Sequence, residues 1–499
     1  MAICTSFSVL MGLAQSGQTV FDESYVHEIR VTFQDPNFWD SLDLYYNNMM
    51  NNGAPNQYLM ASEVSIDGVI IDSVGVRQKG NFSNWGAFNS VKKPLKLDFK
   101  EFADHKFDGL KKLNLANGFE DPTIMRDALA YHIMRSLGLQ APRTAYAKVY
   151  LNNQYWGLYV MIEQVDSEFL EDNFQNPDGN LYKCIDNTSL NNYGTNWNNY
   201  TSEFELKTNE LINDNSRFVD FIQKIHLTSA ADFNDSLDQV LETSDFLAVL
   251  ACDILMYNWD SYYDHGRNFY VYLNPDNNKF DWIPWDYNLA FSSTTTDIIV
   301  DYAVTSAQPK QLVRRMQLDP EFRDLYFAQI CYILLTKFNL TELESYIDQT
   351  AALIRPAYLA DPNKFFSINN FDTNISNPIS VGWGGFYPGL KSFISGRMTT
   401  VMGQLSNYGY SCVLSVDDES EENWKIYPNP IHESLLTIDF VGSEANIPFS
   451  ISTISGEVVK SGETHNGKAI VDFSDLSNGM YIVKAVLGNK VLTQKVVKE

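Results

Sequence analysis

Two short apolar runs, residues 269–273 and 280–284, constrain the fold of this 499-residue chain more than any other feature. The turn-forming sequence Asn-Pro-Asp-Asn-Asn at 274–278 joins them, so the pattern predicts a β-hairpin. Asp260 precedes this hairpin and Asp286 follows it. Because a hairpin folds back on itself, we expect these two carboxylates to lie close together.

Oxygen-rich side chains stand at both ends of the predicted hairpin. Asp260, Asn268 and Asp286 offer the carboxylate and amide oxygens that Mg²⁺ and Mn²⁺ prefer. Protein kinases use a similar order: a catalytic Asp, then an Asn, then a metal-binding Asp. Asn268 lies eight residues after Asp260 (268 − 260), a wider spacing than in that motif, so a turn-stabilising amide is the alternative interpretation of Asn268. Asn288 is a second candidate ligand.

Seven fragments of the chain follow one another in an order that a known protein family shares. They are Arg-Gln-Lys-Gly-Asn-Phe-Ser at 77–83, Lys-Lys-Pro-Leu-Lys-Leu-Asp-Phe at 92–99, Lys-Lys-Leu-Asn-Leu-Ala-Asn-Gly-Phe-Glu-Asp at 111–121, Met-Arg-Asp-Ala-Leu-Ala-Tyr-His at 125–132, Gly-Leu-Tyr-Val-Met-Ile-Glu-Gln-Val-Asp at 157–166, Trp-Asp-Ser-Tyr at 259–262 and Pro-Trp-Asp-Tyr-Asn at 284–288. Over about residues 25–410 the chain thereby resembles the CotH (spore-coat protein H) kinases, which are secreted atypical protein kinases.

This resemblance implies ATP-dependent phosphorylation of Ser or Thr hydroxyls on a protein outside the cytoplasm. It places Asp260 as the catalytic Asp, which orients the acceptor hydroxyl and accepts its proton, with Asp264 as the rival for that role. Without the resemblance, Asp260 is a residue that caps the turn after an apolar helix. Asp286 resembles the metal-binding Asp of the kinase Asp-Phe-Gly motif, and an Arg is the alternative partner for its buried charge.

The resemblance also places the nucleotide against basic residues early in the chain. Residues 80–86 join two strands where kinases keep a glycine-rich loop, although the segment lacks the GxGxxG spacing. Lys96, on the strand after this segment, is the expected phosphate contact, together with Lys79. Arg77 and Lys93 are rivals for that contact, and a solvated surface charge is the alternative for each lysine.

Two further expectations concern acidic residues near the nucleotide. Glu163 closes a strand that leads to the second lobe, so its backbone is expected at the adenine. Its carboxylate could equally pair with Arg126 or Arg143. Asp127 and Glu120 are the candidate partners of Lys96, where protein kinases use a Glu.

Periodicity predicts the order of elements in a bilobal, kinase-like α+β domain. A mixed-β N-lobe is expected first, with strands at 26–33, 58–66, 69–78 and 95–99, a helix at 37–50, a crossing helix at 121–138 begun by Asp121 and Pro122, and two more strands at 145–151 and 157–163. A polar connection at 173–215 leads to a mainly helical C-lobe, with helices at 216–226, 231–240, 244–258, within 308–358 and at 389–406.

The composition changes after an acidic run. Short alternating apolar stretches fill residues 423–499 and predict a small all-β sandwich. Fragments such as Tyr-Pro-Asn-Pro at 427–430 and Leu-Ser-Asn-Gly-Met-Tyr at 476–481 resemble the sorting domain of the Bacteroidetes type IX secretion system. A carbohydrate-binding β module is the alternative. The expected domains are a signal-peptide remnant at 1–18, the kinase-like domain at 20–415, an acidic linker at 416–422 and the sorting domain at 423–499.

Charge and composition limit the partners that we expect. The net charge of −26, from 36 basic and 62 acidic residues, argues against nucleic acid or an anionic membrane as partner. No run reaches 18 apolar residues, so the chain is not expected to be an integral membrane protein. The resemblances instead imply a secreted or cell-surface location, with the type IX secretion machinery and an extracytoplasmic protein substrate as partners.

The cysteines are compatible with several arrangements. If Cys4 leaves with a signal peptide, Cys184, Cys252, Cys331 and Cys412 remain and allow three disulfide connectivities or free thiols. Neither HExxH nor GxSxG occurs, so no motif of the sequence indicates a hydrolase. The function that competes with the kinase is that of a catalytically inactive, kinase-like binding or scaffold protein.

Overall fold

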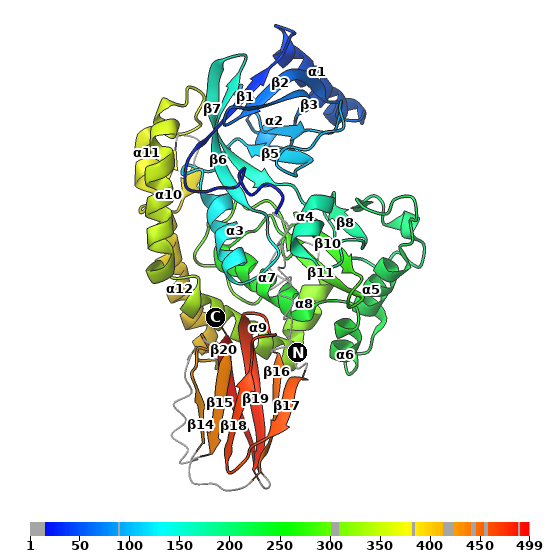
Figure 1. Ribbon diagram of the computed structural model, residues 1–499, viewed down its shortest axis with the longest axis vertical. Coiled ribbons are helices and arrows are strands. Elements are labelled where there is room, and N and C mark those ends of the chain that lie inside the picture. Colours follow the sequence, from blue (N-terminus) through cyan, green and yellow to red (C-terminus); the bar gives the residue numbers. More distant parts are fainter. Residues whose placement is uncertain are drawn as a thin grey trace, which may run out of the picture. The chain divides into compact units, whose positions relative to one another are not determined.

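Figure 1 shows a computed structural model of the chain. It describes residues 15–87, 90–300, 309–381, 385–412, 424–432, 434–440, 446–453, 458–487 and 490–498. The predicted acidic linker lies outside these residues, as do all but 15–18 of the predicted signal remnant. The chain divides into two compact units, each assembled from separate segments. The first comprises Met1–Phe119, Arg143–Pro177 and Leu353–Phe365, and the second comprises Glu120–Pro142, Asp178–Ala352 and Phe366–Glu499.

The first unit is built on a closed β-barrel with strand order β1-β2-β3-β4-β5-β7-β6. Its strands are β1 (His27–Thr32), β2 (Leu59–Ile66), β3 (Val69–Gln78), β4 (Leu95–Asp98), β5 (Lys112–Ala116), β6 (Thr144–Leu151) and β7 (Gln154–Glu163). All neighbouring pairs are antiparallel except β1 and β6, which are parallel. Alternate residues such as Ile29 and Val31 point into a common apolar core, as the period of a strand requires.

The barrel confirms the predicted strands to within three residues at each end, the largest difference being the start of β7. It also holds elements that the periodicity did not predict: β5, the single-turn helix α2 (Phe82–Trp85) and α4 (Ser167–Asn173). The predicted helix at 37–50 is α1 (Phe38–Asn52), which ends at Gly53 in the left-handed conformation that glycine favours.

The second unit contains the helical middle of the chain. Its helices are α3 (Arg126–Ser136), α5 (Ser216–Leu227), α6 (Phe233–Asp238), α7 (Thr243–Met256), α8 (Gln311–Leu318), α9 (Pro320–Thr336), α11 (Ile368–Asn374) and α12 (Leu390–Asn407), together with most of α10 (Leu340–Ala360). Helix α7 is buried along nearly its whole length and carries apolar side chains on all faces, so it forms the centre of this region.

Four strands form a sheet beside these helices, in the order β11-β10-β8-β9. They are β8 (Leu181–Cys184), β9 (Phe204–Leu206), β10 (Phe269–Asn274) and β11 (Lys279–Pro284). The hairpin β10–β11 confirms the prediction from its turn sequence. The prediction of a polar connection throughout 173–215 was wrong, because β8 and β9 lie within it. A smaller pair, β12 (Ile379–Val381) and β13 (Gly385–Tyr387), was also missed.

The described residues after 423 form strands joined by turns and contain no helix, as predicted. One sheet has the order β14-β15-β18 and the other β17-β16-β19-β20, and their apolar side chains share one core. The strands are β14 (Trp424–Tyr427), β15 (Leu435–Phe440), β16 (Pro448–Thr453), β17 (Val458–Glu463), β18 (Lys468–Asp472), β19 (Gly479–Leu487) and β20 (Lys490–Lys498). The chain therefore has a mixed N-terminal β region, a helical middle and C-terminal β sheets.

The predicted start of the crossing helix was wrong. Helix α3 begins at Arg126, five residues after Asp121 (126 − 121). Asp121 nevertheless serves that helix, since its Oδ2 accepts the Arg126 backbone N–H at 2.7 Å. The residues between them form a turn in which Ile124 has a positive φ of 54°, so they cannot form the first helical turn.

One disulfide is described, between Cys331 of α9 and Cys412. Cys184 and Cys252 are free and buried, so the described cysteines combine one bridge with two free thiols and form none of the three two-bridge connectivities. Within the described parts of the chain, no helix is both long enough and apolar enough to cross a bilayer.

Candidate active site

The hairpin β10–β11 brings its two ends together. Phe269 pairs with Pro284, and just beyond them the Trp285 N–H donates to the Asn268 carbonyl at 3.1 Å. Asn268 and Asp286 therefore leave neighbouring strands at the same end of the hairpin. Both have a left-handed backbone with φ of 62°, which turns each residue sharply away from its strand.

The end of α7 delivers Asp260 to this place. The helix stops at Tyr257, whose left-handed backbone reverses the chain, and the Asn258 N–H donates to the Asp253 carbonyl at 2.8 Å. Asp260 lies in the turns that follow. The Asn268 side-chain amide donates both to Asp260 Oδ2 at 2.9 Å and to the Asp260 carbonyl at 3.0 Å. Asn268 thus fixes the position of the predicted catalytic carboxylate.

Three charged neighbours act on the Asp260 carboxyl group. Burial, reinforced by the negative charge of Asp286, raises the pKa of Asp260 to about 6. The Arg267 guanidinium opposes this rise, with its Nε 3.4 Å from Asp260 Oδ1, and His265 opposes it more weakly. The protonation of Asp260 thus depends on the charge of Asp286, which indicates that the two carboxylates predicted to converge lie within electrostatic range.

Helix α3 holds the segment that carries Asp286. The Asp286 N–H donates to the Tyr131 hydroxyl at 2.9 Å, and the Tyr287 N–H donates to Asp127 Oδ1 at 2.8 Å. Asp286 itself is exposed, while Tyr287 beside it is buried and donates its hydroxyl to Asp253. The backbone of residues 286–287 is therefore anchored, and the Asp286 residue is open to solvent.

These residues fit a divalent cation of the Mg²⁺ type. In the described part of the chain, no group of three or more His, Cys, Asp or Glu residues is arranged as a metal cluster. Mg²⁺ needs no such cluster, because it retains water and commonly binds one or two carboxylates together with substrate phosphates. Asp286 supplies a carboxylate for such an ion, and the negative charge of Asp260 nearby adds to the attraction. The Asn268 amide nitrogen donates to Asp260, which leaves the Asn268 amide oxygen as a second ligand atom for the ion.

The other predicted site residues lie in the first unit. Lys96 stands on β4, opposite Asn114 of β5, and its Nζ donates to Gln164 Oε1. The Lys79 backbone N–H donates to the Pro94 carbonyl at 3.0 Å. The Glu163 carboxylate accepts from Arg143, through Nε and the backbone N–H at 3.0 Å each, and so takes one of its two predicted partners.

The predicted rivals and partners of Lys96 have other contacts. Lys93 Nζ donates to the carbonyls of Asn84 and Ala87, at 3.0 and 2.7 Å. These bonds hold the end of the segment 80–86, which stands where kinases have a glycine-rich loop. Glu120 accepts from the Tyr387 hydroxyl. Asp127 accepts from the Tyr287 N–H, so its carboxylate serves the segment around Asp286.

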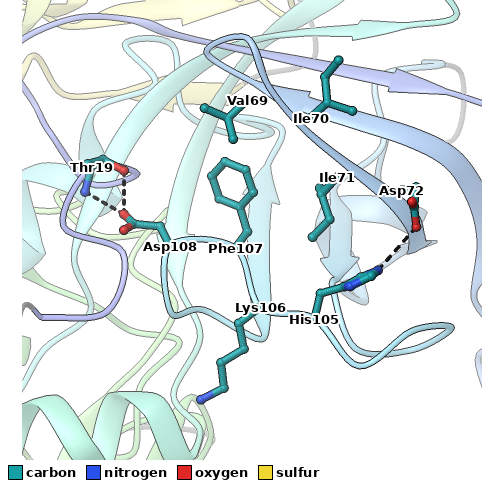
Figure 2. A pocket seen from close by; sticks show the side chains of 9 residues that line it. All are labelled: Thr19, Val69, Ile70, Ile71, Asp72, His105, Lys106, Phe107 and Asp108. Atoms are coloured by element: carbon teal, nitrogen blue, oxygen red, sulfur yellow. Dashed lines mark hydrogen bonds and ion pairs between the residues drawn. The ribbon is translucent and has the colours of Figure 1, made fainter.

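A surface pocket of the first unit is separate from all these residues. It lies over β3 and the turn at 103–110, and the Asp108 carboxylate accepts from the Thr19 hydroxyl at its edge (Figure 2). Its lining residues are Thr19, Val69, Ile70, Ile71, Asp72, His105, Lys106, Phe107 and Asp108. None of the predicted catalytic, metal or nucleotide residues is among them.

Comparison with known families decides what kind of chain this is. The model of the CotH kinase protein family matches residues 76–401, which is more than half of the chain. The chain belongs to the CotH kinase protein family. The model of the secretion system C-terminal sorting domain matches residues 425–499, so the C-terminal sheets are a sorting domain.

Two relatives are similar to this chain in sequence. The inner spore coat protein H of Bacillus subtilis is 26% identical over 55% of this chain and 78% of its own length. The invasin CotH2 of Rhizopus delemar is 24% identical over 34% of this chain, and the match spans only 30% of the invasin. A solved structure of PorZ, a surface component of the type IX secretion system of Porphyromonas gingivalis, is 15% identical over 18% of this chain and 13% of its own, with a TM-score of 0.15.

Membership of the CotH kinase family implies ATP as the cofactor. The sorting domain directs the chain across the outer membrane, to the cell surface or beyond.

Sequence reasoning missed Arg267 as a member of this CotH site. The only signal was its place immediately before Asn268. The direction of its side chain depends on the turn at Gly266, where φ is 76°, and periodicity does not describe such a turn.

Proposed function

We propose that this CotH protein is a protein kinase that transfers the γ-phosphoryl group of ATP to Ser or Thr hydroxyls of a protein outside the cytoplasm. The fold we propose is the bilobal kinase-like fold, with the barrel unit as N-lobe and the helical region as C-lobe. The observation that carries the proposal is the position of Asp260, which Asn268 holds at the end of the hairpin where Asp286 also lies.

In this proposal Asp260 binds the acceptor hydroxyl and accepts its proton. Phosphoryl transfer depends mainly on positioning and charge stabilisation, so a carboxylate is a sufficient base. The Asn268 amide fixes the carboxylate, and a pKa of about 6 leaves it largely ionised at neutral pH. The rival carboxylate, Asp264, lies 3.7 Å from Nδ1 of its neighbour His265, and burial raises its pKa.

Asp286 and Asn268 would hold Mg²⁺ or Mn²⁺ in this kinase. When bound, the ion neutralises phosphate charge and positions the phosphates for transfer. Lys96 and Lys79 remain the proposed phosphate contacts of the barrel unit. The Glu163 N–H donates to the Arg143 carbonyl at 3.0 Å. An adenine contact at the Glu163 backbone would therefore be made by its carbonyl group.

The test is phosphoryl transfer by the purified full-length chain. It would be incubated with labelled ATP, an unstructured Ser/Thr-rich acceptor protein, and Mg²⁺ or Mn²⁺, followed by mapping of the labelled residues. We expect transfer with at least one metal, and a loss of about 10²-fold or more in Asp260→Asn. Asp276→Asn changes an exposed carboxylate in the turn of the same hairpin and should keep full activity. Activity in Asp260→Asn but not in Asp264→Asn would transfer the role to Asp264.

A second candidate function is nucleotide or protein binding without transfer. It is favoured by helix α2, which occupies the segment where kinases have a glycine-rich loop. Calorimetry with ATP and Mg²⁺, combined with the transfer assay, separates the two, because a kinase binds nucleotide and transfers phosphate whereas a scaffold does not transfer it.

A further inference from the structure

Arg267 lies beside the proposed catalytic carboxylate with most of its donors unused. Its Nε is 3.4 Å from Asp260 Oδ1, and the side chain is 37% exposed. Among the residues that the structure describes, no hydrogen bond engages its two terminal nitrogens. The Nε is buried and also lacks a hydrogen-bond partner. Arg267 is therefore a cation that contacts Asp260 on one side and offers N–H groups to solvent on the other.

The backbone around Arg267 is fixed on both sides. The Gly266 N–H donates to the Ser261 carbonyl at 2.9 Å, and the Gly266 carbonyl accepts the Thr188 N–H at 2.7 Å. A Cβ at position 266 would lie 2.0 Å from the Thr188 carbonyl oxygen, so only glycine fits. On the other side, the Asn268 side chain is bound to Asp260. The backbone of Arg267 thus has a defined position before any substrate arrives, and the contact of its Nε with Asp260 directs the side chain toward the site, as electrostatic catalysis requires.

The acidic surroundings of Arg267 make its positive charge suited to a phosphate group. The site gathers the carboxylates of Asp260 and Asp286, in a chain of net charge −26. A phosphorylated nucleotide needs local positive charge to enter such a place. Lys310 is a nearby cation, but its side chain is almost fully buried and its Nζ donates to Ser189 Oγ at 3.3 Å. The partly exposed guanidinium of Arg267 is better placed to meet a phosphate.

We propose that Arg267 is a further catalytic residue that binds the phosphoryl group during its transfer. A planar guanidinium can donate two parallel hydrogen bonds to a phosphoryl group. The inference rests on the proposed kinase function. In the step, the bond between the γ-phosphorus and the oxygen that bridges it to the β-phosphate breaks, and a bond from the γ-phosphorus to the acceptor oxygen forms. The acceptor proton passes to Asp260, ADP leaves, and Arg267 stabilises the charge on the equatorial oxygens of the moving group.

The experiment compares Arg267→Gln and Arg267→Lys with wild type in the full-length protein. Arg30 supplies the matched control, because it is an arginine of 39% exposure with a carboxylate partner, Glu28, at 2.7 Å. We expect Arg267→Gln to lower kcat by about 10²-fold or more. Arg267→Lys keeps the charge and should have a kcat between those of Arg267→Gln and wild type. Arg30→Gln should leave kcat unchanged. The affinity for ADP with Mg²⁺ should stay within about threefold in all variants, since the contact forms with the group in transfer.

A second measurement separates catalysis from mere support of Asp260. Aluminium fluoride with ADP and Mg²⁺ mimics the phosphoryl group in transfer, and calorimetry measures its binding without turnover. Wild type should bind this mimic more tightly than ADP alone, and Arg267→Gln should lose most of that gain. Equal gains in wild type and Arg267→Gln, or unchanged kcat, would overturn the inference while the kinase proposal stands. So would a parallel loss of ADP affinity and of melting temperature. Absence of transfer by wild type would overturn the kinase proposal and this inference together.

Discussion

Lys92 and Asp361 form an ion pair that is closed to solvent, with Nζ 2.6 Å from Oδ2 and side-chain exposures of 1% and 0%. Asp361 also accepts the backbone N–H groups of Leu158 and Asn363, at 3.0 and 2.8 Å. A Cβ at Gly157 would lie within 3.0 Å of the Asp361 carboxylate, so the close approach requires glycine there. This pair attaches the late segment Leu353–Phe365 to the barrel.

Removing one partner of this pair should destabilise the first unit strongly. Asp361→Asn leaves the Lys92 ammonium buried without a counter-charge, and we expect a loss of about 3–5 kcal/mol in urea unfolding followed by Trp fluorescence. Glu344→Gln is the control, because Glu344 pairs with Lys391 at the surface with 56% exposure and should cost at most about 1 kcal/mol. Similar losses in both variants would contradict the argument.

Asp286 should control metal-dependent binding. We expect Asp286→Ala to abolish the part of ATP affinity that depends on Mg²⁺ or Mn²⁺, measured by calorimetry with and without each metal. The fold should survive, because Asp286 is exposed and its segment is anchored through backbone N–H groups. Asp276→Ala, in the turn of the hairpin, should bind as wild type does. Unchanged affinity in Asp286→Ala would remove this residue from the metal site.

His132 should make the protein less stable in mild acid. Its ring stacks on Tyr346 with centroids 3.8 Å apart, and burial lowers its pKa to about 4. The unfolded chain, with a histidine pKa of about 6.5, binds the proton more readily. Stability is therefore full above about pH 6.5 and falls as the pH drops toward 4, by up to about 3 kcal/mol. The difference in urea midpoint between wild type and His132→Gln should change with pH across this window, and a constant difference would contradict the assignment.

The disulfide between Cys331 and Cys412 should stabilise the helical region through the unfolded state. It closes a loop with a sequence separation of 81 residues, for which the chain-entropy model gives about 4.5 kcal/mol. The double variant Cys331→Ala/Cys412→Ala should show that loss in chemical unfolding. Wild type in a reductant should behave like the variant, and the variant should not respond to reductant.

Deleting the sorting domain should change location and leave chemistry intact. A chain ending before Trp424 should accumulate in the periplasm, measured by fractionation and antibody labelling of intact cells. The β sheets of residues 424–498 have their own apolar core, so we expect the purified truncated protein to keep any phosphoryl transfer. Surface display of the truncated chain would contradict the export role.

Local patterns predicted much of this fold, and they failed where distant groups decide the outcome. The alternation around Ile29 and Val31, and the turn sequence at 274–278, are local signals, and the corresponding strands were found. Helix α3 starts late because Asp121 reaches the Arg126 N–H from outside the helix. Strand β8 exists because β10, far along the chain, pairs with it.

The candidate site divides in the same way. Asp260, Asn268 and Asp286 could be predicted together because one hairpin joins them. The contact between Arg267 and Asp260 could not, because it follows the turn at Gly266, where the distant Thr188 carbonyl leaves no room for a side chain. Likewise, nothing near Lys92 in the sequence indicates that its counter-ion lies 269 residues away.

The first unit is assembled from three separate segments of the chain, which limits the order in which its contacts can form. The parallel pairing of β1 with β6 cannot form until residues 144–151 have been synthesised, and the buried ammonium of Lys92 waits longer still for Asp361. Because an exported chain emerges with its N-terminus first, the earliest part of this protein is among the last to reach its final state.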